Sequence, residues 1–106
     1  MRRGEVWLVT LDPTVGSEIQ KTRPCLIVSP PDLVHRLRTL IVIPLTTGSR
    51  PARFRVPLKF QDRQGLVLPE QVRSVDQSRF IRFLGVVDDP TLAAVLAVLR
   101  EMFEEQ

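Results

Sequence analysis

The stretch Thr39-Leu40-Ile41-Val42-Ile43-Pro44-Leu45-Thr46 is the most apolar run in this chain of 106 residues. Its length and its isoleucine and valine content predict a buried central strand. Shorter runs of strand-like composition lie on both sides of it, at residues 5–11, 25–29, 53–58, 65–68, 70–75 and 83–87. Together these runs predict a mainly β fold of six to seven short strands, arranged as a small, strongly curved sheet or barrel.

One helix is predicted near the end of the chain. Asp89 suits its N-cap and Pro90 suits its first position. Apolar residues then recur at helical spacing and form one stripe for packing on the sheet: Leu92, Val95, Leu96, Leu99, Met102 and Phe103. The length fits a single domain, residues 1–106, and a core of this small size makes a homodimer a reasonable expectation.

The loops between these elements are less distinctive. Residues 61–65 are predicted to form a turn, and proline at position 24 is predicted to open the second strand. Residues 32–38 fit either a short helical turn or a loop.

The net charge of +3 is unevenly distributed. Residues 88–106 hold five acidic side chains against Arg100 and sum to −4, so residues 1–87 carry +7. A basic surface is typical of proteins that bind nucleic acid, and an arginine-rich solvated surface is the alternative. Arg53 and Arg55 alternate with apolar residues, so they are predicted to project from one face of a strand and to contact phosphates.

The chain contains one cysteine, Cys25, and one histidine, His35. A metal site needs clustered ligands, so none is expected, and no cofactor motif is present. No apolar run approaches the roughly 20 residues that span a bilayer. The first residues lack the features of a signal peptide. A reducing cytoplasm is therefore the expected location.

Residues 16–24, Gly16-Ser17-Glu18-Ile19-Gln20-Lys21-Thr22-Arg23-Pro24, are predicted to form a loop between two strands. The loop combines positive charge, hydroxyl groups and a carboxylate. Gly16 allows backbone N–H groups to approach an anion. Pro24 pushes Arg23 toward an extended conformation, which gives the arginine side chain a defined direction.

These groups suit cleavage of RNA without a metal. The RNA 2′-hydroxyl is itself the nucleophile, so the protein needs only to align it, stabilise charge on the phosphate and move two protons. Arginine binds phosphate oxygens through two N–H groups but stays protonated. Arg23 is therefore expected to stabilise charge, and Glu18 is the candidate base.

Six motifs, in this order along the chain, resemble the MazF/PemK family of toxin endoribonucleases. They are Arg3-Gly4-Glu5-Val6-Trp7, Leu11-Asp12-Pro13, Val15-Gly16-Ser17-Glu18, Lys21-Thr22-Arg23-Pro24, Ile43-Pro44-Leu45-Thr46-Thr47 and Glu70-Gln71-Val72-Arg73-Ser74-Val75-Asp76. Each motif is weak alone, whereas the ordered set, from about Arg3 to Asp89, is specific.

The resemblance implies an SH3-like barrel with a C-terminal helix, a homodimer, and metal-independent cleavage of single-stranded RNA that leaves a 2′,3′-cyclic phosphate and a 5′-hydroxyl. It also implies a type II toxin–antitoxin pair, in which a separate antitoxin covers the RNA site with an acidic tail. The catalytic positions of the family fall on Arg23 and Thr46, with the adjacent Thr47 as the alternative. The residues expected to bind RNA are Gly16, Ser17, Gln20, Lys21, Thr47, Arg53, Arg55 and Gln71.

Two alternatives stay open. Toxins of the same fold poison DNA gyrase without nuclease chemistry, although the C-terminal aromatic pair of those toxins is missing from the ending Met102-Phe103-Glu104-Glu105-Gln106. The other alternative is an RNA-binding module without catalysis. The short segment 32–38 differs from the longer loop of some relatives, so the cleaved base sequence is not predicted.

Overall fold

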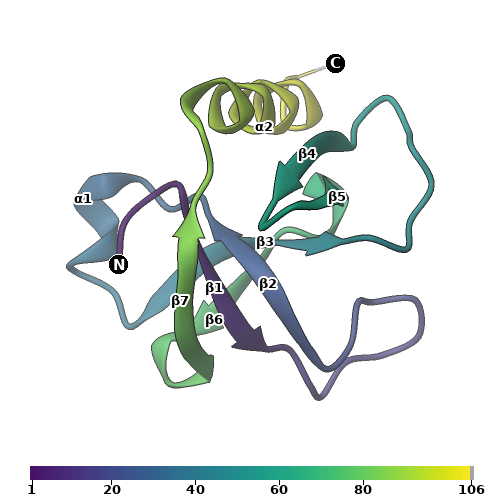
Figure 1. Cartoon of the computed structure of the whole chain (residues 1–106). Coiled ribbons are helices and arrows are strands. Elements are labelled where there is room, and N and C mark those ends of the chain that lie inside the picture. The colour runs from purple at the N-terminus through teal and green to yellow at the C-terminus, as the bar shows by residue number, and fades with distance from the viewer. Residues whose placement is uncertain (106) are drawn as a thin grey trace.

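The computed structural model describes residues 1–105 and contains seven strands and a C-terminal helix (Figure 1). The strands are β1 Glu5–Thr10, β2 Thr22–Ile27, β3 Thr39–Thr46, β4 Val56–Phe60, β5 Arg63–Val67, β6 Arg73–Asp76 and β7 Phe80–Val86. The helical segments are α1 Pro31–Val34, the 3-10 turns η1 Pro69–Gln71 and η2 Gln77–Arg79, and α2 Asp89–Met102. The predicted mainly β fold with a C-terminal helix is confirmed.

The strands form one curved sheet in the order β4-β5-β3-β2-β1-β7, with β6 also paired to β3. Strand β3 is its centre and has the bounds that the sequence predicts. One edge of β3 pairs with β2, and the other edge is shared between β6, at residues 39–42, and β5, at residues 45–46. The β4–β5 hairpin therefore departs from the rest of the sheet at the end of β3, which bends the sheet toward a barrel.

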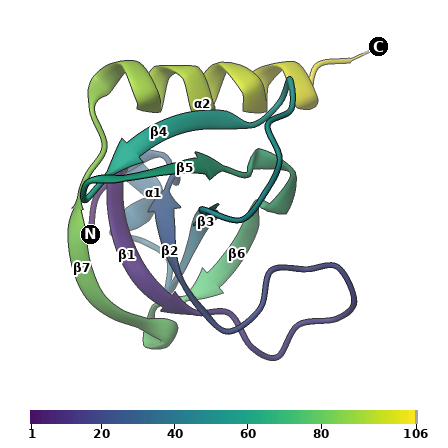
Figure 2. The same cartoon turned by 45° about the vertical axis from the view of Figure 1, so that its right-hand side comes forward.

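Two buried clusters fill the two sides of this curved sheet. Side chains alternate between the faces of a strand, so Leu26 belongs to one cluster and Ile27 to the other. The first cluster also contains Val95 of α2, which lies along β4 and covers the hairpin (Figure 2). In the second cluster, Trp7 and Phe80 pack edge to face with their ring centroids 6.0 Å apart.

Helix α2 begins one residue earlier than predicted. Asp88, not Asp89, is the N-cap, because its carboxylate accepts a hydrogen bond from the Thr91 N–H at 2.8 Å. The predicted apolar stripe is also shorter than expected, since Met102 and Phe103 are 39% and 72% exposed. Within residues 1–105, no helix is long and apolar enough to cross a membrane.

The strand predicted at residues 53–58 is displaced. Strand β4 begins only at Val56, and the Arg55 N–H donates to the Ala52 carbonyl in a turn that precedes the strand. Arg53 and Arg55 therefore lie in the β3–β4 loop, and the prediction that they share one face of a strand is wrong. Proline at position 51 and the local turn override the alternating pattern.

Several other boundaries also differ from prediction, and strand β7, for example, begins at Phe80 and not at residue 83. The turn expected at residues 61–65 contains only Gln61 and Asp62, whose φ angles of 50° and 61° form a two-residue hairpin between β4 and β5. Strand β2 begins at Thr22, so Pro24 lies inside the strand opposite Leu8 and does not open it. The strand expected at residues 70–75 starts only at residue 73, because Pro69 begins the turn η1.

Candidate active site

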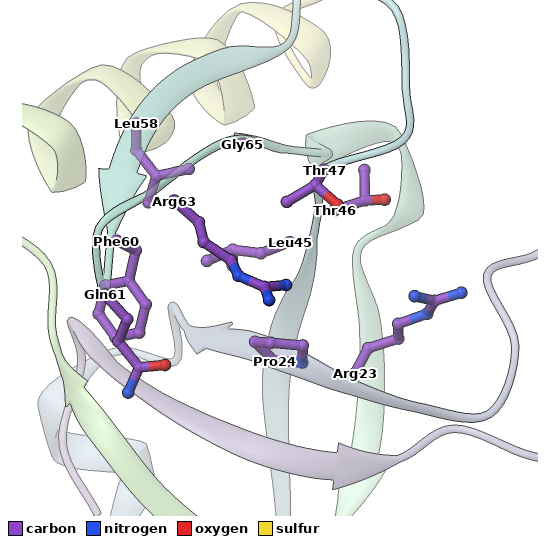
Figure 3. A pocket seen from close by; sticks show the side chains of 10 residues that line it. All are labelled: Arg23, Pro24, Leu45, Thr46, Thr47, Leu58, Phe60, Gln61, Arg63 and Gly65. Atoms are coloured by element: carbon purple, nitrogen blue, oxygen red, sulfur yellow. The ribbon is translucent and has the colours of Figure 1, made fainter.

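A pocket of about 260 Å³ opens where β2 begins and β3 ends (Figure 3). We call it the Arg23 pocket. Its polar lining comes from Arg23, Thr46, Thr47, Gln61 and Arg63, and its apolar lining comes from Pro24, Leu45, Leu58 and Phe60. The pocket therefore combines two positive charges, two hydroxyl groups and an apolar surface.

The antiparallel pairing of β2 with β3 brings the arginine and the threonine together. Cys25 pairs with Pro44 in this ladder, and Arg23 and Thr46 each lie two positions beyond that pair on their own strands. The guanidinium group of Arg23 extends toward Thr46 and Thr47, which lie at the end of β3 (Figure 3). The sequence motifs around these residues thus converge on one pocket.

Local hydrogen bonds fix the direction of Arg23. Its Nε donates to the Gln20 carbonyl at 3.2 Å, so neither terminal nitrogen is used in this bond. Lys21, two residues before Arg23, has a φ of 66°, and its N–H donates to the Asp12 carboxylate at 2.8 Å. The Lys21 carbonyl in turn accepts from the Leu11 N–H at 2.8 Å. The base of the loop is therefore held in one conformation.

Thr46 is positioned from two sides. Its Oγ1 accepts a hydrogen bond from the Gly48 N–H at 3.2 Å, so the hydroxyl proton stays available for a ligand. On the neighbouring strand β5, Gly65 passes so close that a Cβ there would lie 3.0 Å from the Thr46 carbonyl oxygen. A glycine at position 65 is thus what allows the two strands to approach here.

A second pocket, of about 330 Å³, lies next to the same strand β3. Pro44 lines this second pocket, whereas the adjacent residue Leu45 lines the Arg23 pocket. We call the second pocket the Gln71 pocket. Its polar lining comes from Ser17, Glu18, Glu70, Gln71 and Arg73. Two hydrogen bonds shape it: the Glu18 carboxylate accepts from the Val15 N–H at 2.9 Å, and the Gln71 side-chain oxygen accepts from the Ile19 N–H at 3.4 Å.

The structure gives no support for a thiol nucleophile at Cys25 or, within residues 1–105, for a metal site built from carboxylates. Burial raises the pKa of Cys25 to about 12, although the positive charge of Arg73 opposes this shift. A thiol with this pKa is protonated near neutral pH and is a poor nucleophile. Residues 1–105 also contain no cluster of three or more His, Cys, Asp or Glu side chains that could hold a metal ion.

The family model described as "PemK-like, MazF-like toxin of type II toxin-antitoxin system" matches residues 2–103. The chain belongs to this family. It is 44% identical over 81 residues to endoribonuclease PemK from Escherichia coli, a match that covers 72% of this chain and only 61% of the length of PemK. It is 35% identical over 109 residues to the endoribonuclease toxin ChpB from Escherichia coli strain K12, with 96% of this chain and 93% of ChpB covered.

Solved structures agree with this membership of the MazF/PemK family. The crystal structure of MazF (Form-I) from Deinococcus radiodurans has a TM-score of 0.86 to this chain at 26% sequence identity. The match covers 96% of this chain and 94% of that one. It confirms the curved sheet with a C-terminal helix as the fold of this MazF/PemK-family chain.

The structure divides the predicted site residues of this family member between the two pockets. Arg23, Thr46 and Thr47 line the Arg23 pocket, whereas Ser17, Glu18 and Gln71 line the Gln71 pocket. Glu18, the candidate base, is thus not in the same pocket as Arg23. The linings of these two pockets do not include three further predicted residues of the β1–β2 loop, Gly16, Gln20 and Lys21.

Arg53 and Arg55 are engaged with carboxylates. Arg53 forms an ion pair with Glu101 of α2 at 2.9 Å, with both side chains well exposed. Arg55 forms one with Glu70 at 2.8 Å, and these side chains are only 24% and 27% exposed. The better-buried pair fastens the β3–β4 loop to η1, next to the Gln71 pocket.

Sequence reasoning missed Arg63 as a pocket residue. The segment 61–65 was expected to be a turn, and a turn gives no direction to its side chains. No local signal could have found Arg63, because the pair Gln61-Asp62 lacks the asparagine or glycine that is typical of a two-residue hairpin, although the structure forms one here. That hairpin makes Arg63 the first residue of β5, paired with Phe60.

Proposed function

We propose that this protein is a sequence-specific, metal-independent endoribonuclease that cleaves single-stranded RNA as the toxin of a type II toxin–antitoxin pair. The observation that carries this proposal is the Arg23 pocket, in which the guanidinium of Arg23 and the hydroxyls of Thr46 and Thr47 lie together. Membership of the PemK-like and MazF-like toxin family supports it. The names of the relatives PemK and ChpB, both endoribonucleases, support it as well.

The proposed reaction is attack by the RNA 2′-hydroxyl on the adjacent phosphorus. The bond from phosphorus to the 5′-oxygen breaks, and the products are a 2′,3′-cyclic phosphate and a 5′-hydroxyl. Negative charge builds on the phosphate oxygens during the attack, and preorganised donors stabilise it strongly. Arg23 supplies a pair of N–H donors for this charge, and Thr46 supplies a hydroxyl hydrogen bond to the same phosphate.

Two protons move in this reaction, one from the 2′-hydroxyl and one to the 5′-oxygen. Arginine is too basic to accept a proton at neutral pH, so a role for Arg23 as the base is unfavourable. Glu18 is our candidate base. Its carboxylate already holds the Val15 N–H at 2.9 Å, and it lines the Gln71 pocket. This role therefore requires the β1–β2 loop to move toward the Arg23 pocket when RNA binds.

The remaining predicted residues are proposed to bind the RNA on either side of the scissile phosphate. Ser17 and Gln71 line the Gln71 pocket, which offers polar groups for a nucleotide next to that phosphate. Gly16, Gln20, Lys21, Arg53 and Arg55 are proposed to contact the RNA backbone. For Arg53 and Arg55 this requires exchange of the Glu101 and Glu70 ion pairs for phosphate.

We further propose a homodimer of single-domain chains in the cytoplasm. Strand β7 lies at one end of the sheet order and carries three exposed apolar side chains, Ile81, Phe83 and Val86, which are 53%, 50% and 62% exposed. Exposed apolar edge strands favour pairing with another chain. The proposed antitoxin is a separate chain with an acidic tail, which the net positive charge of residues 1–87 would attract.

The test is incubation of the purified protein with a long single-stranded RNA in the presence of EDTA, followed by mapping of the 5′ ends of the products. We expect discrete cuts at a recurring short sequence with 5′-hydroxyl ends. Arg23→Ala is expected to abolish these cuts without loss of the fold, and Thr46→Val to reduce them strongly while Thr46→Ser retains activity. Uncut RNA at micromolar wild-type protein would overturn the proposal, and a DNA supercoiling assay would then test gyrase.

A further inference from the structure

Arg63 is the feature of the Arg23 pocket that the proposed chemistry does not use. It is exposed, it begins strand β5, and its side chain reaches across the middle of the pocket between Pro24 and the threonines (Figure 3). Among residues 1–105, no carboxylate lines this pocket, and no side-chain hydrogen bond or ion pair of Arg63 is formed. Arg63 therefore brings a second uncompensated positive charge to the pocket of Arg23.

Arg63 differs from the neighbouring arginines Arg53 and Arg55, which are paired with carboxylates. Arg53 and Arg55 each satisfy a carboxylate, at 2.9 Å and 2.8 Å. Arg23 and Arg63 instead share one pocket of about 260 Å³. Like charges that line one pocket repel each other, and an anion bound between them offsets that repulsion. The arrangement is that of a site for an anionic ligand.

The backbone that carries Arg63 is held in place, which suits a positioning role. The Gln61-Asp62 turn that precedes it is held to strand β7, because the Gln61 side-chain nitrogen donates to the Leu84 carbonyl at 3.2 Å. Next to the turn, Phe60 packs so closely on Gly85 that a Cβ there would lie 3.1 Å from the ring. The hairpin end is therefore fixed relative to the sheet, and when Arg63 binds a ligand the backbone is already ordered and only the side chain loses entropy.

We propose that Arg63 binds an RNA phosphate next to the scissile one and so positions the strand across the Arg23 pocket. This inference rests on the proposed cleavage of RNA. Arg63 is a positioning residue in this scheme, because the scissile phosphate itself lies at Arg23 and Thr46. Arginine suits the task, since its planar donors bind phosphate oxygens in pairs.

The test measures RNA binding separately from cleavage. The probe is an RNA that spans the mapped cleavage site and carries a 2′-deoxy nucleotide there, so that it lacks the nucleophile. For wild type, Arg63→Ala and Arg63→Lys, the Kd is measured over a series of salt concentrations. The matched control is Arg36→Ala, an exposed arginine just after α1, which lies on the side of the molecule away from the β4–β5 hairpin (Figure 1).

We expect Arg63→Ala to weaken binding about tenfold and to lower the slope of log K against log salt by about 0.7, the value for one phosphate contact on single-stranded RNA. Arg63→Lys should keep the slope, and Arg36→Ala should keep both values. An unchanged slope in Arg63→Ala would overturn the proposed phosphate contact. If the slope is unchanged and the cleaved sequence is altered, Arg63 contacts a nucleobase of the RNA instead. If the wild-type protein neither binds nor cuts RNA, the proposed function fails, and this inference fails with it.

Discussion

The contact between Gly65 and Thr46 predicts a specific defect in the variant Gly65→Ala. The alanine Cβ would lie 3.0 Å from the Thr46 carbonyl oxygen, whereas ordinary contacts begin at 3.4 Å. The two strands must then separate by the difference, about 0.4 Å. Backbone on both sides resists this shift, because Thr46 pairs with Leu66 in the β3–β5 ladder.

The magnitudes follow from this displacement. Overpacking costs about 1–3 kcal/mol, and replacement of glycine restores about 0.4–1 kcal/mol by restricting the unfolded chain, so we expect a net loss of about 1 kcal/mol in the free energy of unfolding. A misplacement of 1 Å in an active site costs about 100-fold in rate, so a 0.4 Å shift of Thr46 should lower kcat/KM about sixfold. Activity is therefore expected to fall although most molecules stay folded.

The assay combines urea unfolding with cleavage of a fluorogenic RNA that contains the mapped site. The matched control is Gly48→Ala, where the nearest atom to the added Cβ is the Thr46 hydroxyl oxygen at 3.9 Å. That distance is an ordinary contact, and the alanine retains the N–H that donates to this oxygen. A Gly65→Ala protein with wild-type kcat/KM would refute the idea that the position of Thr46 limits the reaction.

Three further predictions concern stability, reactivity and assembly. Hydrogen bonds from the Thr91 side chain and then its N–H lower the pKa of Asp88, so this cap stabilises the fold above about pH 4 and is lost as the pH falls through the lowered pKa. Asp88→Ala should therefore lower the Tm at neutral pH, with a smaller difference from wild type near pH 3; an equal difference at both pH values would contradict this. Cys25, buried and with its pKa raised to about 12, should react with Ellman's reagent only after unfolding, and rapid reaction of the native protein would contradict its burial. Ile81→Glu should convert a dimer into a monomer in light scattering, and an unchanged mass would exclude β7 from the interface.

Strand β3 was predictable because one physical signal dominates it. Its side chains are buried on both faces from Val42 to Leu45, and the run from Leu40 to Leu45 is continuously apolar although Ile41 is exposed, so its bounds agree with prediction. Strand β5 was not predictable in the same way. It begins with Arg63 and Gln64, both exposed, and its position depends on the left-handed dihedrals of Gln61 and Asp62. Neither residue type requires that conformation, so composition alone suggested a wider turn.

In the candidate site, too, the residues that belong to motifs were predictable, whereas the contacts that the loops make were not. Motif resemblance selected Arg23 and Thr46 as a pair, and the structure lines one pocket with both. The placement of Glu18 outside that pocket was not predicted, and its carboxylate instead accepts a hydrogen bond from the Val15 N–H within the β1–β2 loop. The ion pair of Arg55 with Glu70 joins residues 15 positions apart and was equally hidden. Contacts of this kind arise from the path of the loops, which sequence periodicity does not describe.

The pairing of the first strand with the last one has a consequence for synthesis of the protein. Strand β1 is hydrogen-bonded to β7 over residues 5–9 and 80–86, and helix α2, which follows β7, completes one of the two cores. A nascent chain therefore carries its Arg23 and Thr46 motifs well before it can close the sheet. Any chain released before residue 80, for example from a severed message, lacks both β7 and α2 and leaves one edge of β1 unpaired. Ribosomes that translate a damaged transcript would thus release fragments that cannot complete this fold.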